Sequence, residues 1–566
     1  MTTPDSPVGP LVVSLLARSV DDFHVVLEAG AAGDADVIEF RLDHIARGLL
    51  DGSVDRTALA KLFVAAGRPT IAAIHGQEAF GTFRGSVTQR SRVLHAASEA
   101  GASYLDIDAS FLAAASLDSV ATPRILSTHR ELSALDAETL DGVAAELDAL
   151  VRPGSGDLIK IVPEAERAED VLALLDWLEK RPEGSTIAFA SGQPAAFSRL
   201  CAPAFGSVFV FAAPVAIDDP SPGAPRLSSA APGQLRVPHM RAVWGGAGCS
   251  PTRRTRLAAV CGRPIGHSAS PVTHAAAFRS LGLDALFLPI APTSFDALAR
   301  ALRAHPRWIG LAVTAPFKID ALELAGGEPG DELAGGACRA ATAIGAANTL
   351  CFRAADGAET GRQFCAVNTD APAIGTAIAD GLGREDFSGL TGLVIGAGGA
   401  ARAAAFALVE RGASVIVAAR RPREAWNVAE KTACPEAQGV TAVDLESDDY
   451  TALRPDIIVH TTPLGTDGIG EPNVPDAHLR PGVAVLDAVY RPRETTLLRR
   501  AAAAGCIPIS GERWFLLQAW LQHLALFEAL YGELNPAAEV RSDAAVSAMG
   551  EALSLWLSGQ TSSQAS

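Results

Sequence analysis

Lysine is rare in this chain, which makes the position of each lysine informative. Five of the 47 basic residues are lysines: Lys61, Lys160, Lys180, Lys318 and Lys431. An arginine side chain stays protonated in proteins, whereas a buried lysine can lose its proton and act as a nucleophile or proton carrier. Lys160 lies in the apolar segment DLIKIVP, and Lys318 follows a strand-like segment in VTAPFK. We predict that these two amines are catalytic and that the other three are solvated.

Length, composition and charge describe a globular protein with several domains. The chain has 566 residues, of which 48% are hydrophobic and 20% charged, so two to four domains are expected. The formal net charge of −17 disfavours a nucleic acid partner, whose phosphates it would repel. No membrane span or signal peptide is predicted. The eight scattered cysteines form no CxxC pair, which predicts neither a metal site nor disulfides and suits a cytoplasmic protein.

Eight short apolar segments recur through the first 240 residues, separated by helix-like segments. Eight strands with helical crossovers are typical of a (β/α)8 barrel, so we predict an α/β protein with such a barrel at its N-terminus. Catalytic groups of a barrel lie at the carboxyl ends of its strands. The polar residues at those predicted ends are Glu39, Arg41, His75, Asp108, His129 and Lys160. The predicted strands cover residues 11–17, 36–43, 70–75, 104–108, 124–130, 157–163, 185–190 and 207–214.

A second βα pattern begins at LAAVCGRPIGHS, after a segment (241–256) that we interpret as a linker. A third region opens with GLVIGAGGAARAAAFALVERG, which predicts a strand, a glycine turn and a helix. Such a turn lets the backbone approach a pyrophosphate, and the helix N-terminus offers free N–H groups to it. A glycine turn without a ligand is the alternative. The residues of the predicted dinucleotide turn are Gly396, Ala397, Gly398, Gly399 and Ala400.

The end of the next strand indicates which nicotinamide coenzyme is bound. An acidic residue there would bind the ribose hydroxyl of NAD, but this chain places Arg420 and Arg421 after the segment ASVIVAA. Two guanidinium groups suit a 2′-phosphate, so we predict NADP. The alternative is that both are ordinary surface arginines.

Eight motifs in order make residues 257–545 resemble the shikimate dehydrogenases. They are GRPIGHSASP (262–271), VTAPFK (313–318), GAANTL (345–350), VNTD (367–370), GAGGAAR (396–402), HTTPLGT (460–466), LDAVYRPRET (486–495) and GERWFLLQ (511–518). The resemblance implies a substrate-binding domain (257–360), a Rossmann NADP domain (361–508) and C-terminal helices (509–558) that return to the substrate domain.

Residues 11–240 resemble the type I 3-dehydroquinate dehydratases. The matching motifs are IEFRLDH (38–44), ILSTHR (125–130), LIKI (158–161), FSRL (197–200) and APGQ (231–234). The resemblance implies that residues 1–240 form the dehydratase-like barrel. Taken together, the chain is similar to the fused dehydratase–shikimate dehydrogenases, whose two activities are successive.

For the barrel, the resemblance implies that Lys160 forms a Schiff base with 3-dehydroquinate and that His129 is the general acid and base. Glu39 would orient His129. Arg41, His75, Arg199 and Gln234 would hold the substrate. The sequence departs from the family at His75, where arginine is usual, and at Ala230, where serine is frequent. We therefore expect weakened or altered substrate binding, and a degenerate barrel is the alternative.

For the second half, the resemblance implies that NADPH reduces 3-dehydroshikimate to shikimate while Lys318 and Asp370 deliver the proton. Ser268 and Ser270 would bind the substrate carboxylate, and Thr461 would contact the coenzyme. The chain departs from the family at Thr466, where methionine is common. The remaining implied substrate contacts are Thr314, Asn348, Tyr490 and Gln518.

The leading interpretation is an enzyme that dehydrates its substrate and then reduces the product, with small molecules as its only partners. Three alternatives stay open: a dehydrogenase carrying a degenerate barrel, a regulatory homologue without catalysis, and an NAD-linked quinate dehydrogenase. The intact lysines argue against the regulatory homologue, and Arg420 and Ser270 argue against the quinate enzyme.

Overall fold

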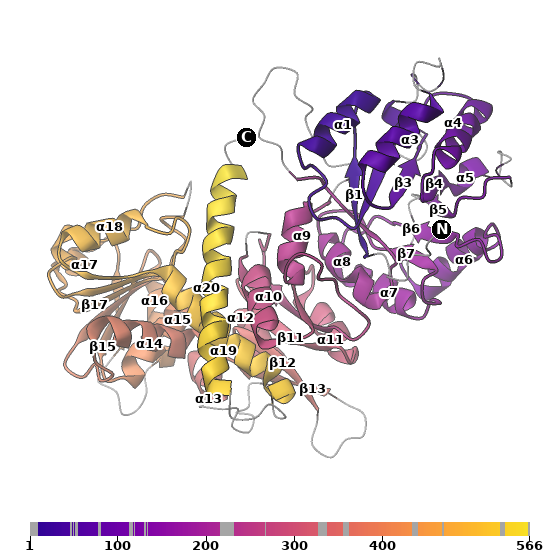
Figure 1. Ribbon diagram of the computed structural model, residues 1–566. Coiled ribbons are helices and arrows are strands. Elements are labelled where there is room, and N and C mark those ends of the chain that lie inside the picture. The colour runs from indigo at the N-terminus through magenta and orange to yellow at the C-terminus, as the bar shows by residue number, and fades with distance from the viewer. Residues whose placement is uncertain are drawn as a thin grey trace. The chain divides into compact units, whose positions relative to one another are not determined.

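The computed structural model divides into two compact units, Met1–Thr255 with Asp284–Ser294, and Arg256–Leu283 with Phe295–Ser566 (Figure 1). It describes residues 9–45, 48, 50, 55–76, 81–112, 117, 119–128, 132, 134–215, 231, 233–266, 268–326, 337–354, 362–432, 440–466, 469–531 and 538–563.

The first unit is built on eight parallel strands in the order β7-β6-β5-β4-β3-β2-β1-β8. The Val208 N–H donates to the Thr186 carbonyl at 3.0 Å, which joins the two ends of this order. The predicted barrel and all eight of its strands are confirmed. The strands are β1 Leu11–Leu15, β2 Val37–Arg41, β3 Thr70–Ala73, β4 Tyr104–Asp108, β5 Arg124–Thr128, β6 Leu158–Ile161, β7 Thr186–Ala188 and β8 Val210–Ala212.

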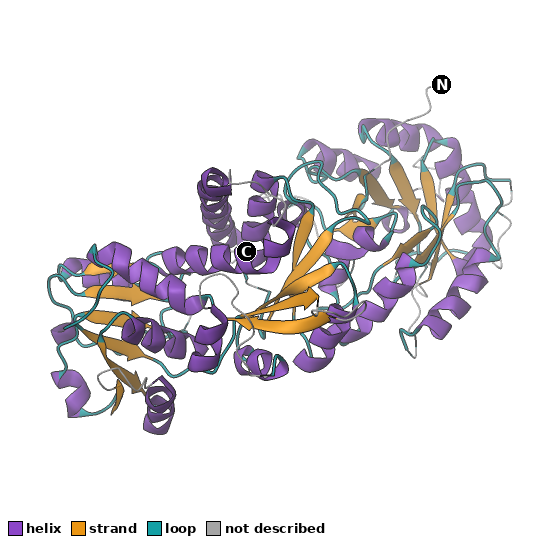
Figure 2. Cartoon of the chain, turned by 90° about the horizontal axis from the view of Figure 1, so that it is seen from below, coloured by secondary structure: helices purple, strands orange, loops and turns teal. Residues whose placement is uncertain are grey.

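Helices surround these strands (Figure 2), and several begin at a short polar side chain that accepts a free backbone N–H. Ser86 and Gln89 cap α4 reciprocally, at 3.3 and 2.8 Å, and Asp136 accepts the Thr139 N–H at 2.8 Å before α6. Fixed helix ends hold the neighbouring strand ends in register. The helices are α1 Val20–Glu28, α3 Arg56–Ala65, α4 Val87–Glu99, α5 Ala109–Leu112, α6 Ala137–Asp148, α7 Ala168–Glu179, α8 Ala196–Cys201 and α9 Val237–Trp244.

Helix α9 includes the first four residues of the segment interpreted as a linker, and β9 begins at its last residue, Arg256. The irregular connection is therefore shorter than the glycine and arginine content suggests, because Val237–Trp244 has enough apolar residues to bury a helix face. Strand β10 (Ala285–Ile290) falls within the segment grouped with the first unit.

A mixed sheet opens the second unit. Strand β9 (Arg256–Cys261) runs parallel to β11 (Trp308–Val313), and β12 (Thr349–Ala354) and β13 (Arg362–Val367) follow in antiparallel order. The helices of this part are α10 Ser270–Leu281, α11 Phe295–Ala304, α12 Lys318–Leu324 and α13 Ala337–Ile344.

A parallel sheet in the order β16-β15-β14-β17-β18-β19 follows, and it confirms the predicted Rossmann architecture. The strand order reverses between β14 and β17, which is where dinucleotides bind in such sheets. Its strands are apolar on both faces because helices cover both. The elements are β14 Thr391–Ile395, β15 Ser414–Ala419, β16 Val440–Asp444, β17 Ile457–His460, β18 Ala484–Asp487, β19 Ile507–Ile509, α14 Asp370–Leu382, α15 Gly399–Glu410, α16 Pro422–Thr432, α17 Asp448–Ala452 and α18 Thr496–Ala503.

Two C-terminal helices, α19 (Gly511–Tyr531) and α20 (Ala538–Ser563), pack against the first part of this unit. The Gln522 Nε2 donates to the Asn348 carbonyl of the mixed sheet at 3.0 Å. Phe515 and Ala519 share an apolar cluster with Ala269 and Met549. The C-terminus therefore stabilises the domain that begins some 250 residues earlier in the chain.

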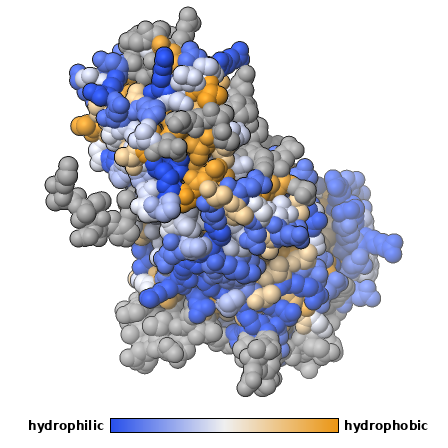
Figure 3. Space-filling model, turned by 90° about the vertical axis from the view of Figure 1, so that its right-hand side faces the viewer, coloured by the Kyte–Doolittle hydropathy of each residue, from blue (hydrophilic) through white to orange (hydrophobic). Residues whose placement is uncertain are grey.

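Hydrophilic side chains cover much of the face drawn in Figure 3. None of the described helices is both long and apolar enough to cross a membrane.

Two buried histidines lie between α10 and α19. The rings of His274 and His523 stack with centroids 5.8 Å apart and planes at 20°. Burial lowers the pKa of His523 to about 3, and burial and the neighbouring His523 lower the pKa of His274 well below 6.5. Both rings are therefore neutral in the folded protein at neutral pH.

These histidines should make the second unit sensitive to acid. Unfolding returns each pKa to about 6.5, so the unfolded state binds more protons and stability falls as the pH drops below about 6.5. Each histidine contributes roughly 1 kcal/mol per pH unit. Unfolding of this unit, followed by calorimetry between pH 7 and 5, should depend less on pH in His523→Leu. An unchanged slope would contradict the assignment, and His305→Leu, on a surface turn, serves as the control.

Candidate active sites

Lys160 lies inside the barrel on β6, with its side chain 6% exposed. Its Nζ is 2.6 Å from Asp106 Oδ2 on β4 and 4.0 Å from the centre of the Phe211 ring on β8. Neither partner was predicted from the sequence. The signal for Asp106 was a charged residue in the middle of the buried segment YLDID. The predicted strand-end residue Asp108 instead accepts the Ser110 N–H at 2.9 Å, at the start of α5.

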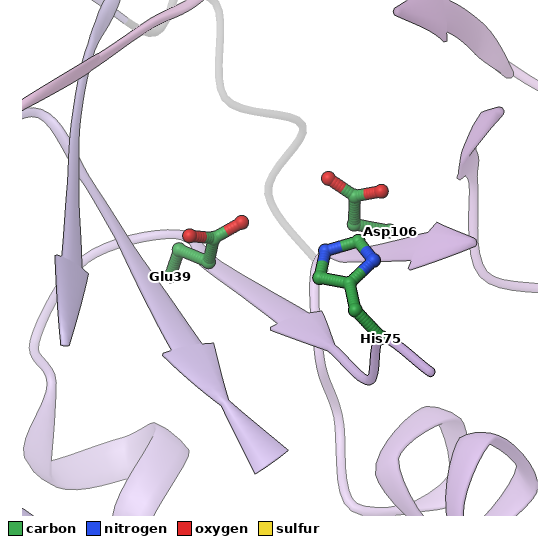
Figure 4. Close-up of side chains that lie close together, drawn as sticks. All are labelled: Glu39, His75 and Asp106. Atoms are coloured by element: carbon green, nitrogen blue, oxygen red, sulfur yellow. The ribbon is translucent and has the colours of Figure 1, made fainter. Parts of the chain in front are cut away.

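Three further groups meet beside Lys160: Glu39 from β2, His75 just after β3, and Asp106 (Figure 4). One ligand atom from each lies within 4.8 Å of the other two, and all three residues are buried. This is the set of described residues that could hold a metal ion. Burial raises the pKa of Glu39, as does the Asp106 carboxylate, whereas Lys160, Arg41 and a Ser14 hydrogen bond lower it.

Arg41, a predicted substrate contact, is bound by a carboxylate of the protein. Its Nε donates to Asp43 Oδ1 at 2.9 Å and its Nη2 to Asp43 Oδ2 at 3.0 Å. Asp43 also accepts the Thr82 N–H at 3.0 Å. The positive charge of Arg41 is therefore balanced internally before any substrate binds.

Arg199 presents the opposite case. It is 1% exposed, its guanidinium stacks on Phe189 at 4.4 Å, and its Nη1 donates to the Phe211 carbonyl at 3.4 Å. Burial lowers its pKa to about 10, so it stays protonated at neutral pH. Within the described part of the barrel no carboxylate pairs with it. A buried cation without a counter-ion costs free energy, and an anion bound beside it would offset that cost.

The remaining barrel predictions are only partly placed. Gln234 precedes α9, and its Oε1 accepts the Ala231 N–H at 3.3 Å. His129 and Ala230 lie outside the described residues.

In the second unit, Lys318 is the first residue of α12 and Asp370 the first residue of α14. The Lys318 Nζ lies 2.6 Å from Asp370 Oδ2, with side chains 16% and 3% exposed. Asn368 Oδ1 accepts the Asp370 N–H at 3.1 Å and so holds that helix end in place. The two predicted partners, 52 residues apart, are therefore brought together.

The Lys318 side chain also lies against the predicted dinucleotide turn. A Cβ placed on Gly399 would come within 2.9 Å of Lys318 Cδ. Gly396 adopts φ 127°, and a Cβ there would collide with the Thr461 hydroxyl. The position of Gly396 therefore requires glycine, and the Lys318 side chain, the turn and Thr461 are neighbours. Ala397 and Ala400 complete the turn into α15.

Hydrogen bonds join two pairs of the predicted substrate contacts. Asn348 Nδ2 donates to the Thr369 hydroxyl at 2.9 Å, and that hydroxyl donates to the Gln518 carbonyl at 3.1 Å, which links them to the residue before Asp370. Ser268 Oγ accepts the Ser270 N–H at 3.3 Å at the start of α10. Tyr490 packs on Phe515 at 5.0 Å, and burial raises its pKa. Thr314 lies just after β11, and its carbonyl accepts the Phe317 N–H at 3.0 Å.

Arg420 and Arg421 are both exposed just after β15. Arg421 Nη2 pairs with Glu424 Oε2 at 2.9 Å, so Arg420 is the more available of the two guanidinium groups. The glycine-rich turn and this cation fit a phosphorylated dinucleotide such as NADP.

A buried hydrogen-bond chain at the same sheet edge was missed from the sequence. His460 Nδ1 and Asp487 Oδ1, paired in register at the ends of β17 and β18, are 2.8 Å apart. Asp487 Oδ2 accepts the Thr495 hydroxyl at 2.6 Å, and His460 Nε2 lies 2.5 Å from Thr462 Oγ1. His460 and Asp487 are fully buried. These hydrogen bonds hold in place the loop that carries Thr461.

Comparison with known proteins identifies both halves. The family model for type I 3-dehydroquinase matches residues 11–245, and that for the shikimate dehydrogenase substrate binding domain matches residues 260–350. An NADP-dependent shikimate dehydrogenase from Halorubrum lacusprofundi is 40% identical over 296 residues, which cover 52% of this chain and 96% of that protein. The chain belongs to the shikimate dehydrogenase family. Its N-terminal half adds the type I 3-dehydroquinase domain, so the predicted resemblance is confirmed.

Two fused proteins are similar to most of the chain. The chloroplastic bifunctional 3-dehydroquinate dehydratase/shikimate dehydrogenase of Arabidopsis thaliana is 28% identical over 531 residues, 90% of this chain and 80% of that one. A solved dehydroquinate dehydratase and shikimate dehydrogenase from S. pombe is 22% identical, with a TM-score of 0.39, and covers 95% of this chain and 98% of its own.

His460→Leu should loosen the coenzyme loop of this shikimate dehydrogenase half. The variant removes two hydrogen bonds and leaves Asp487 buried with fewer donors, a cost of about 1–3 kcal/mol. We expect a higher KM for NADPH and a lower unfolding temperature of the second unit. His478→Leu is the control, because His478 is equally buried but bonds to the Tyr450 carbonyl instead. An equal change of KM in both variants would contradict the role of His460.

Proposed function

We propose that this chain catalyses two consecutive steps, the Schiff-base dehydration of 3-dehydroquinate to 3-dehydroshikimate and the NADPH-dependent reduction of that product to shikimate. The observation that carries the proposal is the pair of catalytic amines, Lys160 and Lys318, each 2.6 Å from a buried carboxylate in its own unit. The family models and the fused relative support the same assignment. We also place the enzyme in the cytoplasm, supported by its free cysteines.

In the barrel, the Lys160 amine attacks the substrate ketone, and loss of water leaves an iminium that accepts the electrons of the C2–H bond. His129 takes the C2 proton and returns a proton to the departing hydroxide. Asp106 and Phe211 hold the amine on the barrel axis, and Arg199 binds the substrate carboxylate. Hydrolysis of the iminium regenerates the lysine, so the net reaction releases one water.

The buried Arg199 favours this mechanism over a degenerate barrel. A buried guanidinium with no carboxylate partner is costly to keep unless an anion arrives during function. Arg41, already paired with Asp43, contributes hydrogen bonds rather than net charge. His75 stands where the family usually has arginine, and Arg41 is paired with Asp43. Among the proposed substrate contacts of the barrel, Arg199 is therefore the cation left for the substrate carboxylate.

In the second unit, NADPH supplies a hydride to the ketone when it is bound by the glycine turn, Thr461 and Arg420. Lys318 donates a proton to the developing alkoxide, and Asp370 orients the amine and stabilises its charged form. Ser268, Ser270 and Tyr490 bind the carboxylate and hydroxyls of the substrate. The contact between Lys318 and Gly399 sets the proton donor beside the coenzyme turn.

Replacing either amine should abolish its own half-reaction alone. Lys160→Arg should lose dehydration of 3-dehydroquinate, and Lys318→Arg should lose reduction of 3-dehydroshikimate, each by at least about 10²–10⁴-fold. Enone absorbance and NADPH consumption measure the two steps separately. Borohydride with 3-dehydroquinate should leave an adduct on Lys160, visible by peptide mass spectrometry. Lys180→Arg, on the C-terminal cap of α7, is the control, and full activity in either catalytic variant would refute the assignment.

Arg420→Gln should raise the KM for NADPH by about 10- to 100-fold, the loss expected for a hydrogen-bonded charge pair, with little effect on NADH. Arg421→Gln should have a smaller effect, because Arg421 is paired with Glu424. Arg423→Gln, at an exposed residue in the first turn of α16, is the matched control. If Arg420→Gln weakened both coenzymes equally, the phosphate contact would be wrong.

A further inference from the structure

We propose that Glu39, His75 and Asp106 bind a divalent first-row transition metal ion such as Zn²⁺, and that this ion reversibly blocks Lys160. The binding site is argued from the geometry and charge of the three residues alone. Its inhibitory effect rests on the proposed dehydratase function.

The ligands come from a rigid scaffold. Strands β2, β3 and β4 are consecutive in the barrel, and Arg41 pairs with Ala73, which pairs with Asp106. Glu39 and Asp106 therefore come from the middle of β2 and β4 and His75 from just after β3, and Figure 4 shows the three side chains projecting toward a common space. Their ligand atoms lie within 4.8 Å of one another. Zinc bonds of about 2.0–2.2 Å need a closure of roughly an ångström, which side-chain rotation supplies.

Local charge favours a cation at this point. Glu39 and Asp106 are buried carboxylates, and the ammonium of Lys160 forms its ion pair with Asp106. The nearby guanidinium of Arg41 is neutralised by Asp43 in a two-bond ion pair. With both carboxylates ionised, Glu39, Asp106 and the Lys160 ammonium together carry one net negative charge, which attracts a cation to this point.

The ligand types select the class of metal. One imidazole nitrogen with two carboxylate oxygens suits Zn²⁺, Co²⁺ and neighbouring transition metals, whereas Mg²⁺ and Ca²⁺ prefer all-oxygen sites. No thiolate belongs to the group, so a bound metal would have nitrogen and oxygen ligands only.

A metal at this position would stop the Schiff-base chemistry. The ion takes the Asp106 carboxylate that holds Lys160 at 2.6 Å, and its charge repels the ammonium. If the amine loses its proton instead, its lone pair becomes a further ligand. The displaced ammonium has no free lone pair, and the coordinated amine has given its lone pair to the metal, so neither form attacks the substrate ketone.

The test uses the full-length chain, freed of metal with a chelator and then titrated with Co²⁺ and Zn²⁺. Co²⁺ should bind with an absorption spectrum free of thiolate charge-transfer bands. His75→Arg and His75→Gln each remove a proposed ligand, so the affinity for Co²⁺ should fall at least about 10- to 100-fold. That is the loss that follows removal of a group that only hydrogen-bonds to a metal ligand. His95→Arg, on α4 away from the group, should bind as the parent chain does. Dehydrogenase activity on 3-dehydroshikimate reports that each variant is folded.

Zn²⁺ should inhibit dehydration at the concentration that fills the site and leave reduction by the same polypeptide unchanged, and Mg²⁺ should do neither. Equal Co²⁺ affinity in the parent and both His75 variants would overturn the proposal, as would thiolate bands in the parent spectrum. If dehydration were absent without metal while the His75 variants still lost Co²⁺, the metal site would stand and the dehydratase assignment would fail.

Discussion

A buried amine paired with a carboxylate is the interaction on which both units depend. Burying a lone charge costs several kcal/mol, and the partner repays that only where the geometry is good. Lys160 with Asp106 and Lys318 with Asp370 both meet this requirement at 2.6 Å, although one pair lies within a barrel and the other spans two helix starts. Each architecture supplies the same local solution: a reactive nitrogen with a defined direction in a site with little water.

The surrounding residues differ because the two reactions differ. In the proposed mechanism the barrel needs an anion site and a nucleophile, and it contains a buried Arg199 with no carboxylate partner among the described residues and a lysine against an aromatic ring. The dehydrogenase needs a proton donor beside a coenzyme, and its Lys318 packs on Gly399 of the dinucleotide turn. The hydrogen bonds from Asp487 to His460 and from His460 to Thr462 hold the loop that carries Thr461. They start from the ends of β17 and β18, which are paired in register.

Most of the architecture could be predicted because its signals are local. Eight apolar segments produced eight barrel strands, and the glycine turn between two apolar strands marked the Rossmann sheet. The predicted linker was too long because local composition underestimates a short helix such as α9, whose burial depends on residues elsewhere. Asp108 was predicted in place of Asp106 for the same reason. Both carboxylates lie on one face of β4, and only the contact of Asp106 with Lys160 on β6 distinguishes them.

The sequence by itself determined the fold class and the family, and it singled out Lys160 and Lys318, because these depend on periodicity and on motifs contiguous in the chain. The tertiary structure alone decided which side chains contact Lys160 and Lys318. Asp106 lies 54 residues from Lys160, and Glu39, His75 and Asp106 converge from three strands. The burial of Arg199 against Phe189 and the Phe211 carbonyl likewise depends on how β7, β8 and α8 pack together. Such contacts follow from strand register and packing, and a one-dimensional pattern does not contain them.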